Sequence, residues 1–205
     1  MLFIIFYNFR GNDIINDISI ITLSEEVTFN KKIAPVCLPS STYEDYVGEE
    51  LTISGWGTLS LYGADTDKLQ VAKVPYHTNQ VCSGPGGPNG GRTKITDNNI
   101  CGGDFYPGKR SHCHGDSGGI CLIIHPFYTI EIKFYIEFHQ NYFLQHIKSI
   151  IGPMTYSEHG RAKLVGISSW TNGCKNPSVY TRVSSYIDWI KQKIQGKKYY
   201  LFSLI

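Results

Sequence analysis

Several features that mark whole classes of protein are missing from this sequence. No apolar run approaches the roughly 20 residues of a membrane-spanning helix. The formal net charge is only +2, with Lys and Arg scattered along the chain, which argues against a nucleic-acid partner. The six cysteines have neither CxxC nor Cys/His ligand spacing. We therefore predict no membrane span, no nucleic-acid binding, no metal and no organic cofactor.

A secretion signal is also absent from these 205 residues. Residues 1–6 are apolar but too short for a signal peptide, and they lack a basic leader and a small-residue cleavage site. The cysteines nevertheless favour disulfides over metal, and disulfides persist in oxidising compartments. We expect an extracellular protein that carries no signal peptide in this sequence. The apolar content of 41% and charged content of 18% are those of an ordinary globular domain.

The hydrophobic pattern favours short strands followed by one helix. Four segments are rich in β-branched residues or alternate in polarity, as strands do: 18–23, 50–54, 69–74 and 164–170. Residues 183–194 place apolar side chains near helical spacing, with Ser184 or Ser185 as a candidate cap. The pattern predicts an all-β barrel with a C-terminal helix.

The most informative motif is the stretch 113–119, CHGDSGG. A serine between glycines, directly after an acid, can stand as an exposed nucleophile in a tight turn. The backbone N–H groups of Gly115 and Ser117 can then point at one spot and form an oxyanion hole. Because G-D-S-G also occurs in plain glycine-rich loops, the surrounding residues must decide between the two interpretations.

Those surrounding residues resemble the chymotrypsin/trypsin-like serine endopeptidase family. The matching segments follow the family's order: Asn16–Ile20, Ala34–Pro39, Ser54–Thr58, the Ser117 motif, Leu164–Trp170, and Val179–Val183 with Tyr186–Ile190. The resemblance runs from about Tyr7 to Gln195 with one interruption. It implies a double antiparallel β-barrel ending in a helix. It also implies proteolysis through an acyl-enzyme, in a parent enzyme that was a zymogen.

The resemblance assigns roles to individual residues. It implies that Ser117 is the nucleophile and that Asp17 orients a histidine base. It also implies a hydrogen bond from Ser169 to the Asp17 carboxylate. The expected partners are protein or peptide substrates and protein inhibitors.

The catalytic histidine is where the chain departs from the family. The family order is His, Asp, Ser, but the first histidine here, His77, follows Asp17. We predict that the catalytic His segment and most of the first barrel are absent, so that the chain as written has no peptidase activity. The resemblance implies that His112 and His114 line the specificity pocket or its rim, so they are not expected to replace the base. The other histidines are expected on the surface: His77, His125, His139, His146 and His159.

An alternative function from a different class stays open. The missing histidine favours a non-catalytic serine protease homologue that binds proteins through a degenerate cleft. The intact GDSGG motif, Asp17 and Ser169 disfavour it, because binding alone requires none of them.

The resemblance also indicates the substrate preference. The base of the pocket lies six residues before the nucleophile, at Ser111, where tryptic members have Asp. The further pocket residues are expected to be His112, His114, Ser169, Trp170, Thr171 and Ser178. Because a basic side chain would be buried there without a carboxylate, we predict non-tryptic, elastase- or chymotrypsin-like cleavage after small or medium apolar residues.

The family positions imply how the cysteines pair. Cys82 should pair with Cys101, and Cys113 with Cys174. Cys37 occupies a position that commonly bridges to an upstream chain, so a disulfide-linked partner is expected there.

One segment interrupts the resemblance. Residues 120–152 stand where the family continues from GDSGG directly into Pro153, and they are rich in Ile, Phe and Tyr. We interpret 120–152, which contains Cys121, as a non-family insertion from a retained intron or a faulty gene model. A real inserted hairpin is the rival interpretation, since loop closure entropy rises slowly with length. The predicted protease domain is then 7–119 with 153–195, flanked by a leader at 1–6 and a tail at 196–205.

Overall fold

The structure is a computed structural model that describes most of the chain outside the 112–151 region. The described residues are 3–6, 14–22, 29–30, 36–58, 63, 68–88, 94–105, 110–111, 152–172, 174, 176–194 and 200–202.

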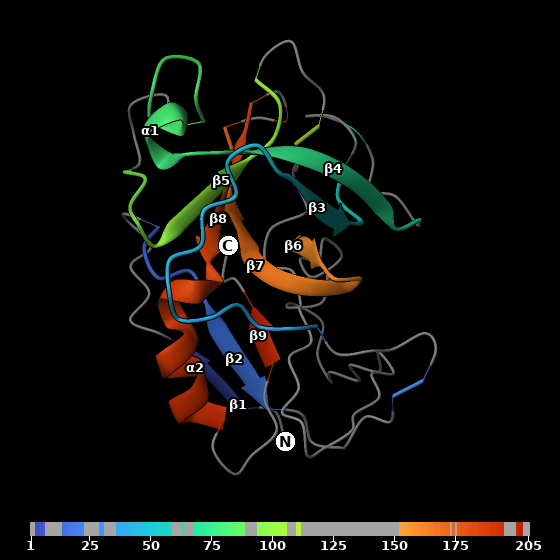
Figure 1. Cartoon of the computed structure of the whole chain (residues 1–205), viewed down its shortest axis with the longest axis vertical. Helices are drawn as coiled ribbons and strands as arrows, with labels where there is room; N and C mark the ends of the chain where they lie inside the picture. Colours follow the sequence, from blue (N-terminus) through green and yellow to red (C-terminus); the bar gives the residue numbers. More distant parts are fainter. Residues whose placement is uncertain are drawn as a thin grey trace, which may run out of the picture.

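Strands dominate the described part of the chain (Figure 1). The strands are β1 (Phe3–Phe6), β2 (Ser19–Thr22), β3 (Glu50–Gly55), β4 (Gln70–His77), β5 (Asn99–Gly102), β6 (Pro153–Glu158), β7 (Arg161–Trp170), β8 (Ser178–Arg182) and β9 (Tyr200–Phe202). The helices are α1 (Asn79–Cys82), the 3-10 turn η1 (Val183–Tyr186) and α2 (Ile187–Ile194). The predicted all-β fold with a C-terminal helix is confirmed.

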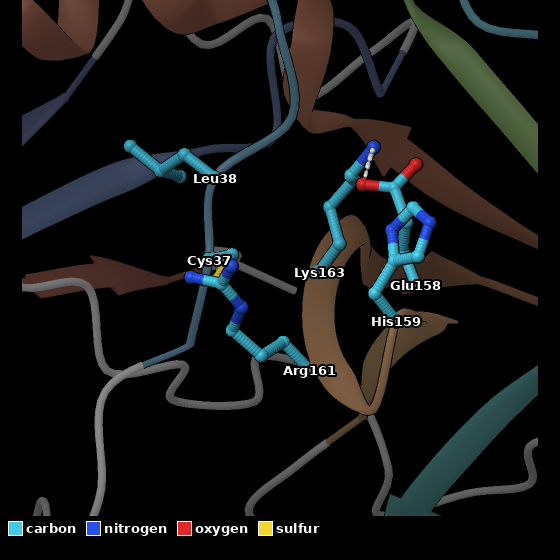
Figure 2. Close-up of a pocket in the computed structure, with 6 residues that line it drawn as sticks. All are labelled: Cys37, Leu38, Glu158, His159, Arg161 and Lys163. Carbon is cyan, nitrogen blue, oxygen red and sulfur yellow. Dashed lines mark ion pairs between the residues drawn. The ribbon is translucent and has the colours of Figure 1, made fainter.

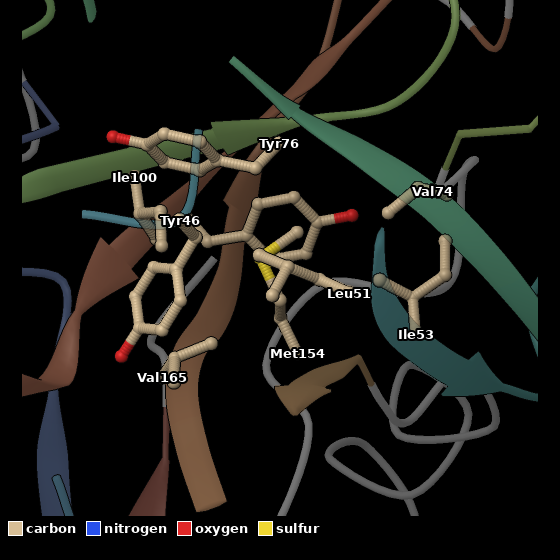
Figure 3. Close-up of a cluster of buried hydrophobic side chains, with 9 residues drawn as sticks. Tyr46, Leu51, Ile53, Val74, Tyr76, Ile100, Met154 and Val165 are labelled. Atoms are coloured by element: carbon tan, nitrogen blue, oxygen red, sulfur yellow. The ribbon is translucent and has the colours of Figure 1, made fainter. Parts of the chain in front are cut away.

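Six strands close into a barrel in the order β3-β4-β5-β8-β7-β6, and every pairing is antiparallel. Its core is a cluster of apolar and tyrosine side chains that converge between the strands (Figure 3): Tyr46, Leu51, Ile53, Val74, Tyr76, Ile100, Met154, Val165 and Tyr180. The β6–β7 turn uses His159 and Gly160, both at positive φ (50° and 76°). Two positive φ values suit the right-handed twist of a two-residue hairpin.

A second core joins the barrel to the smaller sheet β1-β2-β9. The buried residues Ile18 and Ile20 pack with Leu164 and Ile167 of β7 and with the helical residues that follow β8. In Figure 1, α2 runs alongside β2 beneath the barrel. This packing holds the chain around Asp17 against the ends of β7 and β8.

Two of the four predicted strands, β4 and β7, are clearly longer in the structure than the sequence predicts. β4 continues to His77 rather than stopping at residue 74, because Tyr76 and His77 pair with β5. β7 begins at Arg161, three residues before the predicted strand, because it forms the hairpin with β6.

The predicted serine cap of the last helix is wrong. η1 begins directly after β8 with Arg182 as N-cap and without a capping side chain. Ser184 and Ser185 lie inside this turn, so neither is placed before the first free N–H groups. Among the described residues, no helix combines the length and apolar character that crossing a bilayer requires.

Candidate active site

The structure describes only part of the predicted site. Asp17, Ser111, Ser169, Trp170, Thr171, Ser178, Cys82, Cys101 and Cys174 lie within the described residues. Ser117, Gly115, His112, His114 and Cys113 lie outside them. The nucleophile and the oxyanion hole therefore stay predictions.

Asp17 is a buried carboxylate held by a strand far away in the sequence. Its side chain belongs to a residue that is only 1% exposed, and its Oδ2 accepts a hydrogen bond from Ser169 Oγ at 2.6 Å. Ser169 is itself fully buried near the end of β7. Burying a carboxylate costs free energy unless it is hydrogen-bonded. The hydrogen bond from Ser169 offsets part of this cost at Asp17.

Two further side chains hold the turn around Asp17. Thr181 Oγ1 of β8 donates to the carbonyl oxygen of Asp17 at 2.7 Å. Tyr186 Oη of η1 donates to Asn16 Oδ1 at 2.9 Å. Asn16 has a positive φ of 57°, a conformation that Asn tolerates better than most residues. Hydrogen bonds from β7, β8 and η1 thus hold this turn in place.

Sequence reasoning assigned no role to Thr181 or Tyr186. Both lie within the segment that carried the family resemblance, but their separations of 164 and 170 residues from the Asp17 turn hide the contact. Only the spatial neighbourhood of β8 and η1 reveals that they support the acid.

The predicted pocket residues Ser111 and Ser178 meet in space. Ser111 Oγ lies 2.6 Å from Ser178 Oγ and donates to the carbonyl oxygen of Asn176 at 2.7 Å. Since a hydroxyl has one hydrogen, Ser178 must be the donor in the contact between the two serines. Ser178 is fully buried. The two predicted pocket residues thus form one pair of neutral hydroxyls.

One histidine differs from its prediction. His77 was expected on the surface, but it is half-buried, with Nε2 2.7 Å from the carbonyl oxygen of Gly103 and its ring packed edge-on against Phe105 at 4.8 Å. His77 lies at the end of β4, where it pairs with Cys101 of β5 and is therefore partly covered. His159 is exposed, as predicted.

The predicted disulfide between Cys82 and Cys101 is present and ties α1 to β5. Both cysteines are fully buried beside Ile95 and Val179. Cys174 is also disulfide-bonded, and its partner is not among the described residues. Its pairing with Cys113 stays a prediction.

Cys37 is a free, half-buried thiol beside a small pocket. The pocket has a volume of about 240 Å³ and is lined by Cys37, Leu38, Glu158, His159, Arg161 and Lys163 (Figure 2). Lys163 Nζ pairs with Glu158 at 3.0 Å and with Glu44 at 3.1 Å. The segment with Cys37 is bound to the start of β7 by hydrogen bonds to Ala162 and from Leu164.

Glu44 is the most perturbed carboxyl near this pocket. Burial by itself raises its pKa, but hydrogen bonds from Tyr46, Lys163 and Ser40 outweigh burial and lower the pKa to about 2. The Tyr46 hydroxyl donates to Glu44 Oε2 at 2.6 Å. Burial together with this contact raises the pKa of Tyr46. Glu44 therefore stays ionised at neutral pH and links the 36–49 segment to β7.

Comparison with known proteins gives a consistent result. A family model described as Trypsin matches residues 3–127 and 152–190. Trypsin-1 of Astacus astacus is 33% identical over 187 residues, which cover 90% of this chain and 62% of that relative. Trypsin of Sus scrofa is 34% identical over 193 residues, which cover 91% of this chain and 63% of that relative.

A third relative is of a different kind. Transmembrane protease serine 11B of Homo sapiens is 31% identical over 195 residues, which cover 93% of this chain and 38% of that relative. The chain thus spans just over three fifths of the length of the two trypsins and a smaller share of the third protein.

Proposed function

Because this chain belongs to the trypsin family, we propose that it carries the nucleophile and the orienting acid of a serine endopeptidase. The observation that carries the proposal is the buried Asp17 carboxylate, bonded to Ser169 at 2.6 Å and braced by Thr181. An acid held in this way can fix the tautomer of a histidine base and stabilise the imidazolium that forms. Ser117 would attack the peptide carbonyl once that base takes its proton.

The base is not supplied by any residue before Asp17 in the printed sequence. Loss of one triad member leaves roughly 10³–10⁴-fold catalysis over water, from binding and the oxyanion hole. We therefore expect a polypeptide of these 205 residues to show no measurable peptide cleavage by itself. An added small base can test this directly, because it can occupy the place of the missing imidazole.

The proposed specificity is for small or medium apolar side chains. Ser111 and Ser178 supply neutral hydroxyls that satisfy each other and the Asn176 carbonyl. A lysine or arginine side chain of a substrate would be buried next to them without a carboxylate partner, which is costly. Trypsin-like cleavage is therefore disfavoured, and elastase- or chymotrypsin-like cleavage is proposed.

Imidazole rescue of ester cleavage tests the function. We expect the 205-residue polypeptide to hydrolyse N-acetyl-valine p-nitrophenyl ester only when imidazole is present. The rescue should saturate with ester and be lost in Ser117→Ala, whereas the exposed Ser157→Ala serves as the matched control and keeps it. Equal rescue in Ser117→Ala would contradict the role of Ser117 as nucleophile. Robust peptide cleavage without imidazole would contradict the prediction that these 205 residues lack the catalytic base.

The same experiment addresses specificity and the alternative function. Esters of N-acetyl-alanine and N-acetyl-valine should react faster than that of N-acetyl-lysine, and the reverse order would overturn the proposed preference. A protein that shows no Ser117-dependent rescue with any ester, yet binds protein ligands, would instead be a non-catalytic homologue.

Partners and location follow from the same proposal. We propose protein substrates and protein inhibitors as partners. We also propose an upstream chain that is disulfide-linked through Cys37, which is supported by the free thiol of Cys37 beside a pocket. The Cys82–Cys101 disulfide supports an oxidising, extracellular location. Labelling of Cys37 with a thiol reagent, before and after reduction of the natural protein, tests the upstream disulfide. Reactivity already complete before reduction would contradict it.

The proposed insertion at 120–152 has support from two observations. The family match has a gap at residues 128–151, which lies within the proposed insertion, although the match itself extends through residues 120–127. β6 begins at Pro153 and pairs at once with β3 and β7, as an uninterrupted domain would require. Sequencing of the transcript decides the matter, because mature messenger RNA that retains codons 120–152 in every copy would contradict an intron.

A further inference from the structure

The chain that leads to Ser111 closes on itself through one ion pair. Asp104 and Arg110, a pair that we call the neck, are joined to each other, and the Asp104 N–H donates to the Arg110 carbonyl oxygen at 2.8 Å. The Arg110 backbone N–H donates to Asp104 Oδ2 at 3.1 Å. The Arg110 guanidinium adds Nε to Oδ2 at 3.0 Å and Nη2 to Oδ1 at 2.9 Å. Four hydrogen bonds thus join these two residues.

The same guanidinium also ties the neck to the barrel. Arg110 Nη1 donates to Glu50 Oε1 at 2.8 Å and to the Lys73 carbonyl at 3.0 Å. Glu50 begins β3 and Lys73 lies within β4. All three guanidinium nitrogens are therefore engaged. A single residue, Arg110, thus connects the neck with two paired barrel strands.

Gly103 shows how closely this neck packs on the Ser178 strand. It has a φ of +128°, and a Cβ built there would lie 3.0 Å from the Arg110 carbonyl oxygen and 3.1 Å from Pro177 Cα. Its N–H donates to the Pro75 carbonyl at 3.0 Å, and its carbonyl lies 2.7 Å from His77 Nε2. The neck has little freedom to move independently of β4 and the 176–178 chain.

We propose that Arg110 is a positioning residue that sets the place of Ser111, and with it the substrate preference. Ser111 follows Arg110 directly, and its hydroxyl reaches Asn176 and Ser178. This inference rests on the proposed function, because it assumes that these hydroxyls face a substrate side chain. Arg110 itself acts only through Ser111.

The geometry requires arginine rather than any cation. The fork presents donors to two carboxylates and one carbonyl at once, whereas a lysine nitrogen is a single compact group. The side chains of Arg110 and Glu50 are 46% and 50% exposed. Exposed ion pairs are weakened by salt, so the positioning should be sensitive to ionic strength.

The experiment compares two esters under imidazole rescue. N-acetyl-valine p-nitrophenyl ester has a side chain to fill the pocket, and p-nitrophenyl acetate has none. In Arg110→Ala we expect a roughly tenfold lower kcat/KM for the valine ester, mostly through KM, with an unchanged rate for the acetate. A tenfold change corresponds to about 1.4 kcal/mol. Arg110→Lys should restore only part of the lost kcat/KM. In the wild type, 1 M NaCl should lower kcat/KM for the valine ester but not the rate for the acetate.

Controls separate positioning from general damage. Lys191→Ala removes an exposed cation on α2 and should leave both esters unchanged. Glu50→Gln removes the negative charge of one partner of Arg110 and leaves Ser111 unchanged, and it should give a smaller loss in the same direction if Arg110→Ala does not fold. Equal loss for both esters, or no loss for either, would overturn the proposal.

A structural readout distinguishes this proposal from the proposed function. In a crystal structure of Arg110→Ala we expect the Ser111 and Ser178 hydroxyls to lie beyond hydrogen-bonding distance; in Glu50→Gln, if only that variant folds, we expect the contact between them to be longer than in the wild type. An unchanged 2.6 Å contact would overturn the positioning role whatever the esters show. Wild-type protein without Ser117-dependent rescue would overturn the proposed function, and the link from Arg110 to substrate preference with it.

Discussion

Asp17 and Ser111 are both fixed by long-range hydrogen bonds, but the surroundings that fix them differ. Asp17 is 1% exposed and sits on an apolar core built by β2, β7 and the C-terminal helix. Ser111 is half-buried and follows an ion pair whose cation is 46% exposed. Apolar packing has no charges for salt to screen, whereas exposed charges are screened. The Asp17 carboxylate is therefore held by a buried core, whereas Ser111, the predicted specificity residue, is held next to an exposed ion pair.

This contrast has a functional reading under the proposed activity. The orienting acid must keep one geometry for every substrate, because it acts on the base rather than on the substrate. The pocket base decides which side chain is accepted. Substitutions at the exposed charges of the neck leave the barrel core undisturbed. Specificity can therefore change while Asp17 stays in place.

The largest expected effect comes from breaking the core beneath Asp17. Ile18→Ala removes a fully buried side chain next to the acid. Such truncations cost about 2–5 kcal/mol through lost burial and a residual cavity. Urea unfolding should show this loss. The 64% exposed Val71 offers the control, since Val71→Ala should change the free energy of unfolding by no more than about 0.5 kcal/mol. Similar small losses for both variants would contradict the core that the structure shows.

A smaller effect is expected from the hydrogen bond to the acid. Ser169→Ala deprives Asp17 Oδ2 of its 2.6 Å donor. Leaving a buried polar group short of a partner costs about 1–3 kcal/mol, and more for a charge. The measurement is again urea unfolding, and the exposed Ser157→Ala should be neutral. A neutral Ser169→Ala would mean that Asp17 does not depend on this bond.

The smallest expected effect is a pH dependence of stability that comes from Glu44, a partly exposed carboxylate. Glu44 bonds to Tyr46, Lys163 and Ser40, and its pKa is lowered to about 2 in the folded chain from an ordinary 4.5. A lowered pKa stabilises the fold above the unfolded-state value, and this stability is lost as pH falls through the folded value. Partial exposure limits the contribution to about 1 kcal/mol or less.

Glu44→Gln isolates this contribution. The difference in free energy of unfolding between wild type and Glu44→Gln should be full near pH 6 and should shrink as pH falls from about 5 toward 2. Thermal unfolding at several pH values measures it. A difference that stays constant across this range would rule out a Glu44 linkage.

Much of the fold could be predicted because its signals are local. Alternating apolar residues located β2, β3, β4 and β7 to within a few residues, since side-chain period follows directly from strand geometry. The strand ends were less predictable, because β4 and β7 extend only where partner strands allow pairing. The serine cap failed for a related reason, since β8 runs straight into η1 and leaves no separate helix start.

The candidate site divides in the same way. The residues Asp17, Ser111, Ser169 and Ser178 were identifiable because each lies within or at a fixed offset from a family segment. Their support was not, because Thr181, Tyr186 and Arg110 reach partners 60 to 170 residues away. His77 was misassigned because nothing in its neighbours reveals that the Gly103 carbonyl and Phe105 lie beside it.

The sequence alone determined which chemical groups this protein has and the strand pattern that carries them: an acid, a glycine-flanked serine, and neutral hydroxyls at the predicted specificity positions. Only the tertiary structure decided that the acid is buried on a shared core and that an arginine clamps the neck beside Ser111. Hydrogen bonds between groups distant in sequence depend on how strands register and close into a barrel. That closure is a property of all the packed residues together and not of any local pattern.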